Sequence, residues 1–382
     1  MSASRCAAAA LALAVLAAGC GGATRPANTP SSPAVSLSLT TAVTGPGATW
    51  AAVPMGAASG ANQFWQLFML PSGGGQWSLQ TPPDIATNGA LILAGQAGQG
   101  IVVGERPSLY LTFSAITATG DGGNTWATLP PVSGLAGVPD ALAGASGGRL
   151  IALSGHQDVS VTRAAAGSWA MLTTRQALAA APAARACALT ELTAAAYTPA
   201  GSPMLAGTCG RAGMAGIFGY AGGTWHQAAP TLPAALARQP VRVLRLSQAG
   251  RGDAALLQAG IGPSASLIGA WTTDGGQQWR LSAPFGLGGA HAVSASFGSD
   301  GATAVVLSGD RGETLAGPGA SWRALPPLPP GRTVTLALPA AGTTDALAAD
   351  GSSLTVWQLR PGPAAWARTQ AIKVPIQYGS SS

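Results

Sequence analysis

The sequence predicts an all-β fold, a single β-propeller. Three observations predict it: a tryptophan that recurs at regular intervals, a composition rich in turn formers, and short strand-like runs between the turns. The recurring residues are separated by 49, 43, 56, 54, 43 and 44 residues, and they are Trp77, Trp126, Trp169, Trp225, Trp279, Trp322 and Trp366. A period of about 40 to 50 residues is typical of a propeller, in which each repeat forms one four-stranded sheet, or blade.

The composition supports strands and turns over helices. Only 8% of the residues are charged, whereas glycine occurs 54 times and proline 29 times. Aromatic and β-branched residues lie in short runs between glycine and proline clusters, which favours an all-β protein. The hydrophobic fraction of 47% argues against disorder. A chain of this length could form two domains, but a propeller accommodates it as one.

The N-terminal residues 1–19 read as a lipoprotein signal peptide. Arg5 precedes an Ala/Leu/Val run over residues 6–18 that is too short to span a bilayer. The run ends in Leu16-Ala17-Ala18-Gly19-Cys20, which resembles a bacterial lipobox, although Ala17 stands where that family usually has leucine. The resemblance implies cleavage before Cys20 and attachment of lipid to its thiol. The alternative is an ordinary secretory signal with an incidental cysteine.

Residues 20–33 follow as the lipidated cysteine and a flexible linker, because this segment is small, polar and rich in proline. Residues 34–382 then form the propeller domain. The sequence therefore predicts a domain held by its lipid on the extracytoplasmic face of a bacterial cell membrane.

Each repeat divides into four short strands, with the repeat tryptophan on the last of them. The first repeat reads as strands over 34–43, 48–55, 62–70 and 75–80, which places Trp50 on a second strand. Three further tryptophans fall on third strands, namely Trp65, Trp271 and Trp357. This division gives seven blades, with six or eight as alternatives. The run 371–378 is one strand too many, and we expect it to pair with the first blade and help to close the ring.

Two cysteines remain in the predicted domain, after Cys6 in the signal and Cys20 at the lipid site. Cys187 and Cys209 lie in one repeat, and in an exported protein such a pair predicts a disulfide. The enclosed loop corresponds to a stabilisation of about 3 kcal/mol. The three histidines lie in different repeats, so we expect neither a metal site nor a cofactor. His156 is predicted to be a turn residue.

Two turn motifs recur at equivalent points of their repeats. The segment 119–126, TGDGGNTW, fits S/T-x-D-x-G-x-T-W in full, and the segment 272–279, TTDGGQQW, fits all but the second threonine. An aspartate can bond turn amides, glycine accepts positive φ, and the tryptophan packs between sheets. The motifs resemble the Asp-box, or BNR repeat, of sialidase-like propellers, which implies a structural role far from the axis. The candidate residues are Thr119, Asp121, Gly123, Thr125, Trp126, Thr272, Asp274, Gly276 and Trp279.

The same resemblance raises the possibility of a sialidase. That chemistry, as the family implies it, needs an arginine cluster, a Tyr/Glu nucleophile pair and an acidic proton donor. The chain has four tyrosines, and its glutamates stand only at Glu105, Glu191 and Glu313. The polar group Glu105-Arg106-Pro107 is better explained as a solvated turn. We therefore assign no catalytic residue.

The sequence thus predicts a binding or scaffolding module for a protein or glycan partner on one propeller face. At the level of fold it resembles exported Asp-box propellers of the sortilin-ectodomain and photosystem-assembly-factor type. The alternatives are a glycan-active hydrolase or lyase and a passive envelope component. The net charge of +6 comes from scattered arginines without interleaved aromatics, which argues against nucleic-acid binding. We expect a monomer.

Overall fold

A computed structural model of the chain describes residues 40–56, 63–82, 90–95, 100–106, 116–129, 139–162, 168–362 and 365–375. The predicted signal segment, Cys20, the linker and residues 34–39 lie outside the described residues, as does Pro107. The account below concerns the unit that spans Ser36–Ser382.

The described strands form seven antiparallel groups of consecutive strands, so the predicted all-β class is confirmed. Pairing of β1 with β22 and of β14 with β17 joins four of these groups into two larger sheets. The first four groups are β1 (Thr40–Thr44), β2 (Ala48–Gly56), β3 (Gln63–Pro71) and β4 (Ser78–Leu79); β5 (Ala90–Gly95), β6 (Ile101–Arg106), β7 (Ile116–Thr119) and β8 (Ala127–Leu129); β9 (Pro139–Gly144), β10 (Leu150–Ser154), β11 (Asp158–Thr162) and β12 (Trp169–Thr174); and β13 (Leu189–Tyr197), β14 (Pro203–Cys209), β15 (Gly216–Ala221) and β16 (Thr224–Gln227).

The remaining three groups follow the same plan. They are β17 (Val241–Ala249), β18 (Gly252–Ala259), β19 (Ser266–Thr272) and β20 (Arg280–Leu281), with β21 (Phe285–Gly286) also on β19; β22 (Ala292–Phe297), β23 (Thr303–Leu307), β24 (Arg311–Leu315) and β25 (Trp322–Ala324); and β26 (Thr333–Ala340), β27 (Thr343–Asp350), β28 (Ser353–Leu359) and β29 (Ala367–Lys373).

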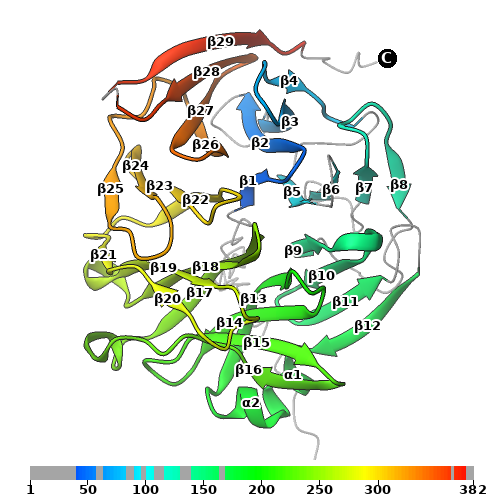
Figure 1. Ribbon diagram of the computed structural model, residues 1–382, viewed down its shortest axis with the longest axis vertical. Coiled ribbons are helices and arrows are strands. Elements are labelled where there is room, and N and C mark those ends of the chain that lie inside the picture. Colours follow the sequence, from blue (N-terminus) through cyan, green and yellow to red (C-terminus); the bar gives the residue numbers. More distant parts are fainter. Residues whose placement is uncertain are drawn as a thin grey trace, which may run out of the picture. The chain divides into compact units, whose positions relative to one another are not determined.

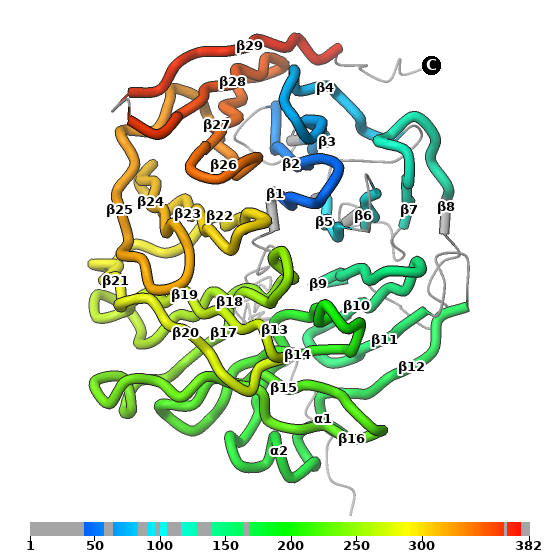
Figure 2. Tube along the Cα trace, viewed as in Figure 1, coloured from blue at the N-terminus to red at the C-terminus, as the bar shows by residue number. Residues whose placement is uncertain are grey.

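The seven groups are the blades of a closed propeller. The first strands of the blades contact one another in the order β1, β5, β9, β13, β17, β22 and β26, and β26 contacts β1 again. Figures 1 and 2 show these innermost strands around the centre of the ring. One pairing joins blades that are not neighbours in this order: β1 of blade 1 also pairs in parallel with β22 of blade 6.

A hydrophobic cluster lies between each blade and the next, around the whole ring. Each sheet is therefore buried on both faces, which explains apolar runs such as Leu150–Ser154 and Thr303–Leu307, where every residue is buried. Such runs lack the alternation of apolar and polar residues that marks a half-buried strand in the sequence. The recurring tryptophan was therefore the stronger signal of the fold.

The seven repeat tryptophans occupy equivalent places, at or just before the fourth strand, except that Trp225 is the second residue of β16. Four indole N–H groups donate a hydrogen bond to the preceding blade. These bonds run from Trp77 to Asp345 Oδ2 (2.9 Å), from Trp279 to the Ala228 carbonyl (2.7 Å), from Trp322 to Ser282 Oγ (3.2 Å) and from Trp366 to the Pro326 carbonyl (3.4 Å).

The other three indoles contact the preceding blade by packing. The ring of Trp126 meets the ring of Trp50 of blade 1 edge-on, with centroids 6.2 Å apart. Trp169 lies in the cluster between blades 2 and 3, and Trp225 packs against the cluster between blades 3 and 4. Each repeat tryptophan thus joins its own blade to the one before it.

The expectation for the run 371–378 was wrong. Residues 371–373 continue β29, the outermost strand of blade 7, and residues 376–378 lie outside the described residues. No strand breaker separates Thr369 from Ala371, and β28 offers a partner along the whole length of β29. The run still packs against blade 1, because Ile372 and Val374 belong to the cluster between blades 7 and 1. Next to it, the side-chain amide of Gln370 bonds both the N–H and the carbonyl of Trp77, at 2.9 and 2.8 Å.

Two short helices that the sequence analysis did not anticipate connect blades 3 and 4: α1 (Arg175–Ala180) and α2 (Pro182–Arg185). Thr174 caps α1, because its hydroxyl accepts a hydrogen bond from the Ala177 amide at 3.1 Å. The structure also has 3-10 turns at Ser146–Gly148, Ala234–Leu236 and Gly262–Ser264. No helix among the described residues has the length and hydropathy of a membrane span.

Candidate functional site

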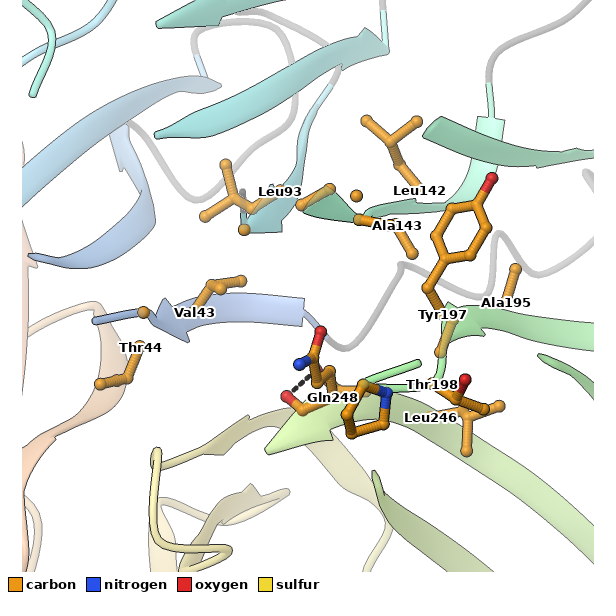
Figure 3. A pocket seen from close by; sticks show the side chains of 18 of the residues that line it. Val43, Thr44, Leu93, Leu142, Ala143, Ala195, Tyr197, Thr198, Leu246 and Gln248 are labelled. Atoms are coloured by element: carbon orange, nitrogen blue, oxygen red, sulfur yellow. Dashed lines mark hydrogen bonds between the residues drawn. The ribbon is translucent and has the colours of Figure 1, made fainter. Parts of the chain in front are cut away.

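The candidate site is a cavity of about 420 Å³ on the axis of the ring. Its wall comes from the ends of the innermost strands of five successive blades, from the turns that follow them, and from Ser299 after β22 of blade 6. Figure 3 shows Val43, Leu93, Leu142, Ala195 and Leu246, one residue from each of these strands, around the cavity. A pocket of this size suits a small ligand or one side chain of a larger partner.

The wall is mainly small and apolar. Besides Tyr197 and Arg245, its polar side chains are the hydroxyls of Thr44, Ser146, Thr198, Ser247 and Ser299 and the amide of Gln248. None of the described residues in the wall is aspartate, glutamate, histidine or cysteine. The wall therefore offers apolar contact and hydrogen bonds, and it lacks the paired carboxylates that acid–base hydrolysis of glycans requires.

Tyr197 forms a fixed part of the wall. Its hydroxyl donates a hydrogen bond to the Leu150 carbonyl of the neighbouring blade at 3.1 Å. The guanidinium of Arg149 lies 5.5 Å from the centre of its ring and bonds the Gly201 carbonyl at 2.9 Å. Burial raises the pKa of Tyr197 to about 12. The phenol is thus neutral and already bonded, and it offers mainly the flat side of its ring.

Arg245 is the charged residue of the wall, and only 4% of it is exposed. Its guanidinium donates hydrogen bonds to the carbonyl of Ala42 at 3.0 Å and to the carbonyl of Ala295, and it lies 4.8 Å from the centre of the Phe297 ring. Burial lowers the pKa of Arg245 to about 9, so the group stays charged at neutral pH.

The cation of Arg245 has no counter-charge among the described residues. It forms no ion pair, and its Nε–H is buried without a hydrogen-bond partner. Burying a charge is costly unless it is paired, and carbonyl groups and an aromatic ring offset only part of that cost. The base of the pocket therefore holds an unneutralised positive charge.

A polar cluster lies at the opposite end of the same inner strands. His156, in the turn after β10, donates a hydrogen bond from Nδ1 to the Leu192 carbonyl (2.9 Å), and its backbone N–H donates to Asp140 Oδ2 (2.7 Å). Glu191 Oε1 lies 3.9 Å from the His156 ring and 3.6 Å from Nη2 of Arg242. Asp140, Glu191 and Arg242 stand near the starts of β9, β13 and β17. We call these four residues the paired cluster.

The structure places His156 in the turn where it was predicted, but it also brings the two carboxylates to it, which the sequence did not indicate. Among the described residues, no group of three acidic, histidine or cysteine side chains could hold a metal ion. The paired cluster thus brings two carboxylates, one guanidinium and one imidazole together.

Cys187 and Cys209 form a disulfide, with their Cα atoms 5.2 Å apart. It joins the segment after α2 to the end of β14, beside the paired cluster, because Thr208 on the same strand donates a hydrogen bond to Glu191 Oε2 at 3.3 Å. The disulfide therefore fixes the end of the ring away from the pocket.

The first Asp-box-like segment forms a closed turn on the outer hairpin of blade 2. Asp121 accepts hydrogen bonds from the Thr119 hydroxyl (2.7 Å), the Thr125 amide (3.0 Å) and the Thr125 hydroxyl (2.6 Å). These bonds, led by those from Thr125, lower the pKa of Asp121 to about 2. Gly123 has φ +89°, a conformation that glycine adopts without strain.

The second segment forms the same turn in blade 5. Asp274 accepts from the Thr272 hydroxyl (2.7 Å) and from the amides of Gln277 and Gln278 (both 2.9 Å), and Gly276 has φ +92°. The pKa of Asp274 is also lowered, chiefly by the Gln278 amide. Both turns lie away from the pocket wall, so neither contributes a side chain to it.

The sequence analysis missed Arg245 and Tyr197. In the segment VRVLRLS, Arg245 follows Val241 and Val243 at alternate positions, but a β-bulge between Val243 and Arg245 turns the arginine to the opposite face of the sheet from the two valines. The sequence does not show this bulge, so it gave no sign that Arg245 is buried.

Comparisons with known proteins show the fold and no more. No protein-family model and no curated protein matches the chain. Among solved structures, a putative 6-phosphogluconolactonase from Bacteroides uniformis is 16% identical, with a TM-score of 0.52, over 85% of this chain and 96% of that one. YCF48 bound to a D1 peptide is 12% identical, with a TM-score of 0.47, over 80% and 88%. The six-bladed β-propeller lectin of Aleuria aurantia is 13% identical, with a TM-score of 0.41, over 88% and 96%. Such likeness extends to architecture alone, and the chain is identified by its own ring of sheets as a β-propeller.

Proposed function

We propose that this chain is a lipid-anchored propeller on the extracytoplasmic face of a bacterial membrane, and that it binds a protein or glycan partner through its axial pocket. The lipobox-like segment ending at Cys20 supports the anchor. The Asp-box-like turns act in the propeller as structural elements, and we propose that the protein works as a monomer.

The observation that carries the binding role is the chemistry of the pocket. A cavity of about 420 Å³ with apolar walls, a few hydroxyls and one buried cation is suited to holding a ligand. Acid–base catalysis needs a proton donor or acceptor within reach of the substrate. The described wall supplies none with a pKa near neutrality, which favours binding over the alternative of a glycan-active hydrolase or lyase.

The proposal is tested by site-specific photocrosslinking of the full chain in bacterial membranes. A benzophenone amino acid replaces Gln248, an exposed residue of the pocket wall. The matched control places it at Met171 on β12, whose side chain is 59% exposed on the outside of blade 3. We expect one discrete adduct from position 248 and none from position 171. The added substitution Ser247→Trp, which fills the cavity, should suppress it.

Equal adducts from both positions, or an adduct that Ser247→Trp does not change, would contradict the proposal. The enzyme alternative has its own test, in which the purified full chain is incubated with 4-methylumbelliferyl glycosides. Turnover that follows the protein through purification would replace the binding role by catalysis.

A further inference from the structure

The charge of Arg245 is not explained by the fold alone. Its two hydrogen bonds reach the carbonyls of Ala42 and Ala295, which belong to the parallel pair β1 and β22, and so they connect blade 5 to blades 1 and 6. Neutral side chains with amide donors could form such bonds without burying a charge. A guanidinium has more donors than these two bonds use, and the Nε–H is without a partner.

The acidic groups near the pocket do not neutralise it. Asp300, next to the wall residue Ser299, is exposed, and its Oδ1 accepts a hydrogen bond from the Ala302 amide at 3.0 Å. Asp253 stands opposite Gln248 in the sheet, and burial raises its pKa to about 7, which leaves it largely protonated below neutral pH. The other nearby cation, Arg149, lies over the Tyr197 ring and bonds the Gly201 carbonyl. The region around the cavity is thus short of negative charge.

The walls above this charge favour hydrocarbon over sugar. Val43 and the alanines of the inner strands line the cavity, together with the small exposed parts of Leu93, Leu142 and Leu246, which also pack in the clusters between blades. The hydroxyl of Tyr197 is already bonded to a backbone carbonyl. A sugar would bring many hydroxyls to a wall with few free partners, and unpaired polar groups are costly to bury. A hydrocarbon group next to an anion matches both features of the cavity.

We propose that the axial pocket binds an apolar carboxylate: a molecule or chain end in which a carboxylate adjoins a hydrocarbon side chain, with the carboxylate at the guanidinium of Arg245. This inference rests on the proposed function and specifies its ligand. A planar carboxylate matches the fork of N–H donors on a guanidinium, and such charge-assisted bonds are stronger than neutral ones.

The test uses the full chain in detergent, with leucine methyl groups labelled for NMR. The probes are N-acetyl-L-leucine, its neutral amide and glucuronate. We expect N-acetyl-L-leucine to shift the methyl signals of Leu93, Leu142 and Leu246 and to bind about tenfold more tightly than the amide, with glucuronate weaker than both. A C-terminal peptide ending in leucine and the same peptide amide distinguish a chain end from a free acid.

The variant Arg245→Gln should reduce the affinity for the acid to that for the amide, whereas Arg242→Gln in the paired cluster should leave both unchanged. Equal binding of acid and amide by the wild type would overturn the inference, as would tighter binding of glucuronate or no shift with any probe. These results need no variant, so they hold even if Arg245→Gln does not fold. They leave the crosslinking from position 248 as a separate test of the proposed function.

Discussion

Two arginines on one strand, three positions apart, have opposite environments. Arg242 lies near the start of β17, 40% of its side chain is exposed, and its Nη2 is 3.6 Å from Glu191 Oε1. Arg245 lies further along the same strand, is 4% exposed, and has no acidic partner among the described residues. One charge is neutralised by the protein itself, and the other is not.

The two ends of the ring differ in the same way. At the paired cluster, each charged side chain has a partner, and the disulfide fixes the strands beside it. At the pocket end, the walls are apolar and the polar groups lie at the base and the rim. Arg242 has an acidic partner although its Nε–H is also buried without a hydrogen-bond partner, whereas the buried charge of Arg245 has no acidic partner among the described residues and would gain from one. The difference indicates that the ring is stabilised at one end and binds at the other.

The largest expected change in stability comes from removing the disulfide beside the paired cluster. Replacing both cysteines, as Cys187→Ala with Cys209→Ala, should lower the free energy of unfolding by about 3 kcal/mol, because the open loop regains conformational entropy in the unfolded state. Urea denaturation measures this change. Affinity for N-acetyl-L-leucine in native conditions should stay the same, and a parallel loss of affinity would show that the two ends are not independent.

A smaller effect of opposite sign is expected at the pocket end. Burial raises the pKa of Asp253 from 3.8 to about 7, so the folded state binds its proton more tightly than the unfolded state does. Below about pH 4 the carboxyl is protonated in both the folded and the unfolded state. As the pH rises from about 4 to 7, the unfolded state loses the proton first, so the free energy of unfolding falls. Asp253→Asn removes this penalty and should stabilise the protein at pH 8, with little effect at pH 4.

Thermal or urea unfolding at the two pH values checks this. The control variant is Asp300→Asn, which changes an exposed carboxylate near the same rim. This substitution should change the free energy of unfolding little at either pH. A destabilising Asp253→Asn at pH 8 would mean that the buried carboxylate has an ionic role that the structure does not show.

The smallest effect is expected for the exposed arginine. Arg242→Gln should change the free energy of unfolding by only about 0.5 kcal/mol, because water screens its ion pair with Glu191. A loss several times larger would remove the contrast between the two arginines and would make the paired cluster the principal electrostatic feature of the ring.

The ring could be predicted because a tryptophan at the same place in each repeat contacts the preceding blade. The indoles of Trp77, Trp279, Trp322 and Trp366 bond the preceding blade in the same way, and their spacing along the chain records that contact. The disulfide followed from the number of cysteines and the predicted compartment. The extra strand at 371–378 was predicted wrongly, because the length of β29 depends on its partner β28.

The site was not predictable in the same way. Its wall collects two to four residues from each of five strands that are far apart in the sequence, and many of them are alanine, valine or leucine, which any core strand contains. Arg245 differs from Arg242 only through burial and the distance to Glu191, and both are properties of the assembled ring.

The most direct measurement is a crystal structure of the protein with N-acetyl-L-leucine. The account predicts the leucine side chain among Val43, Leu93 and Leu142, with the carboxylate within hydrogen-bond distance of the guanidinium of Arg245. A carboxylate bound beside Arg242 and His156 at the other end, or a ligand with its carboxylate turned out to solvent, would contradict it.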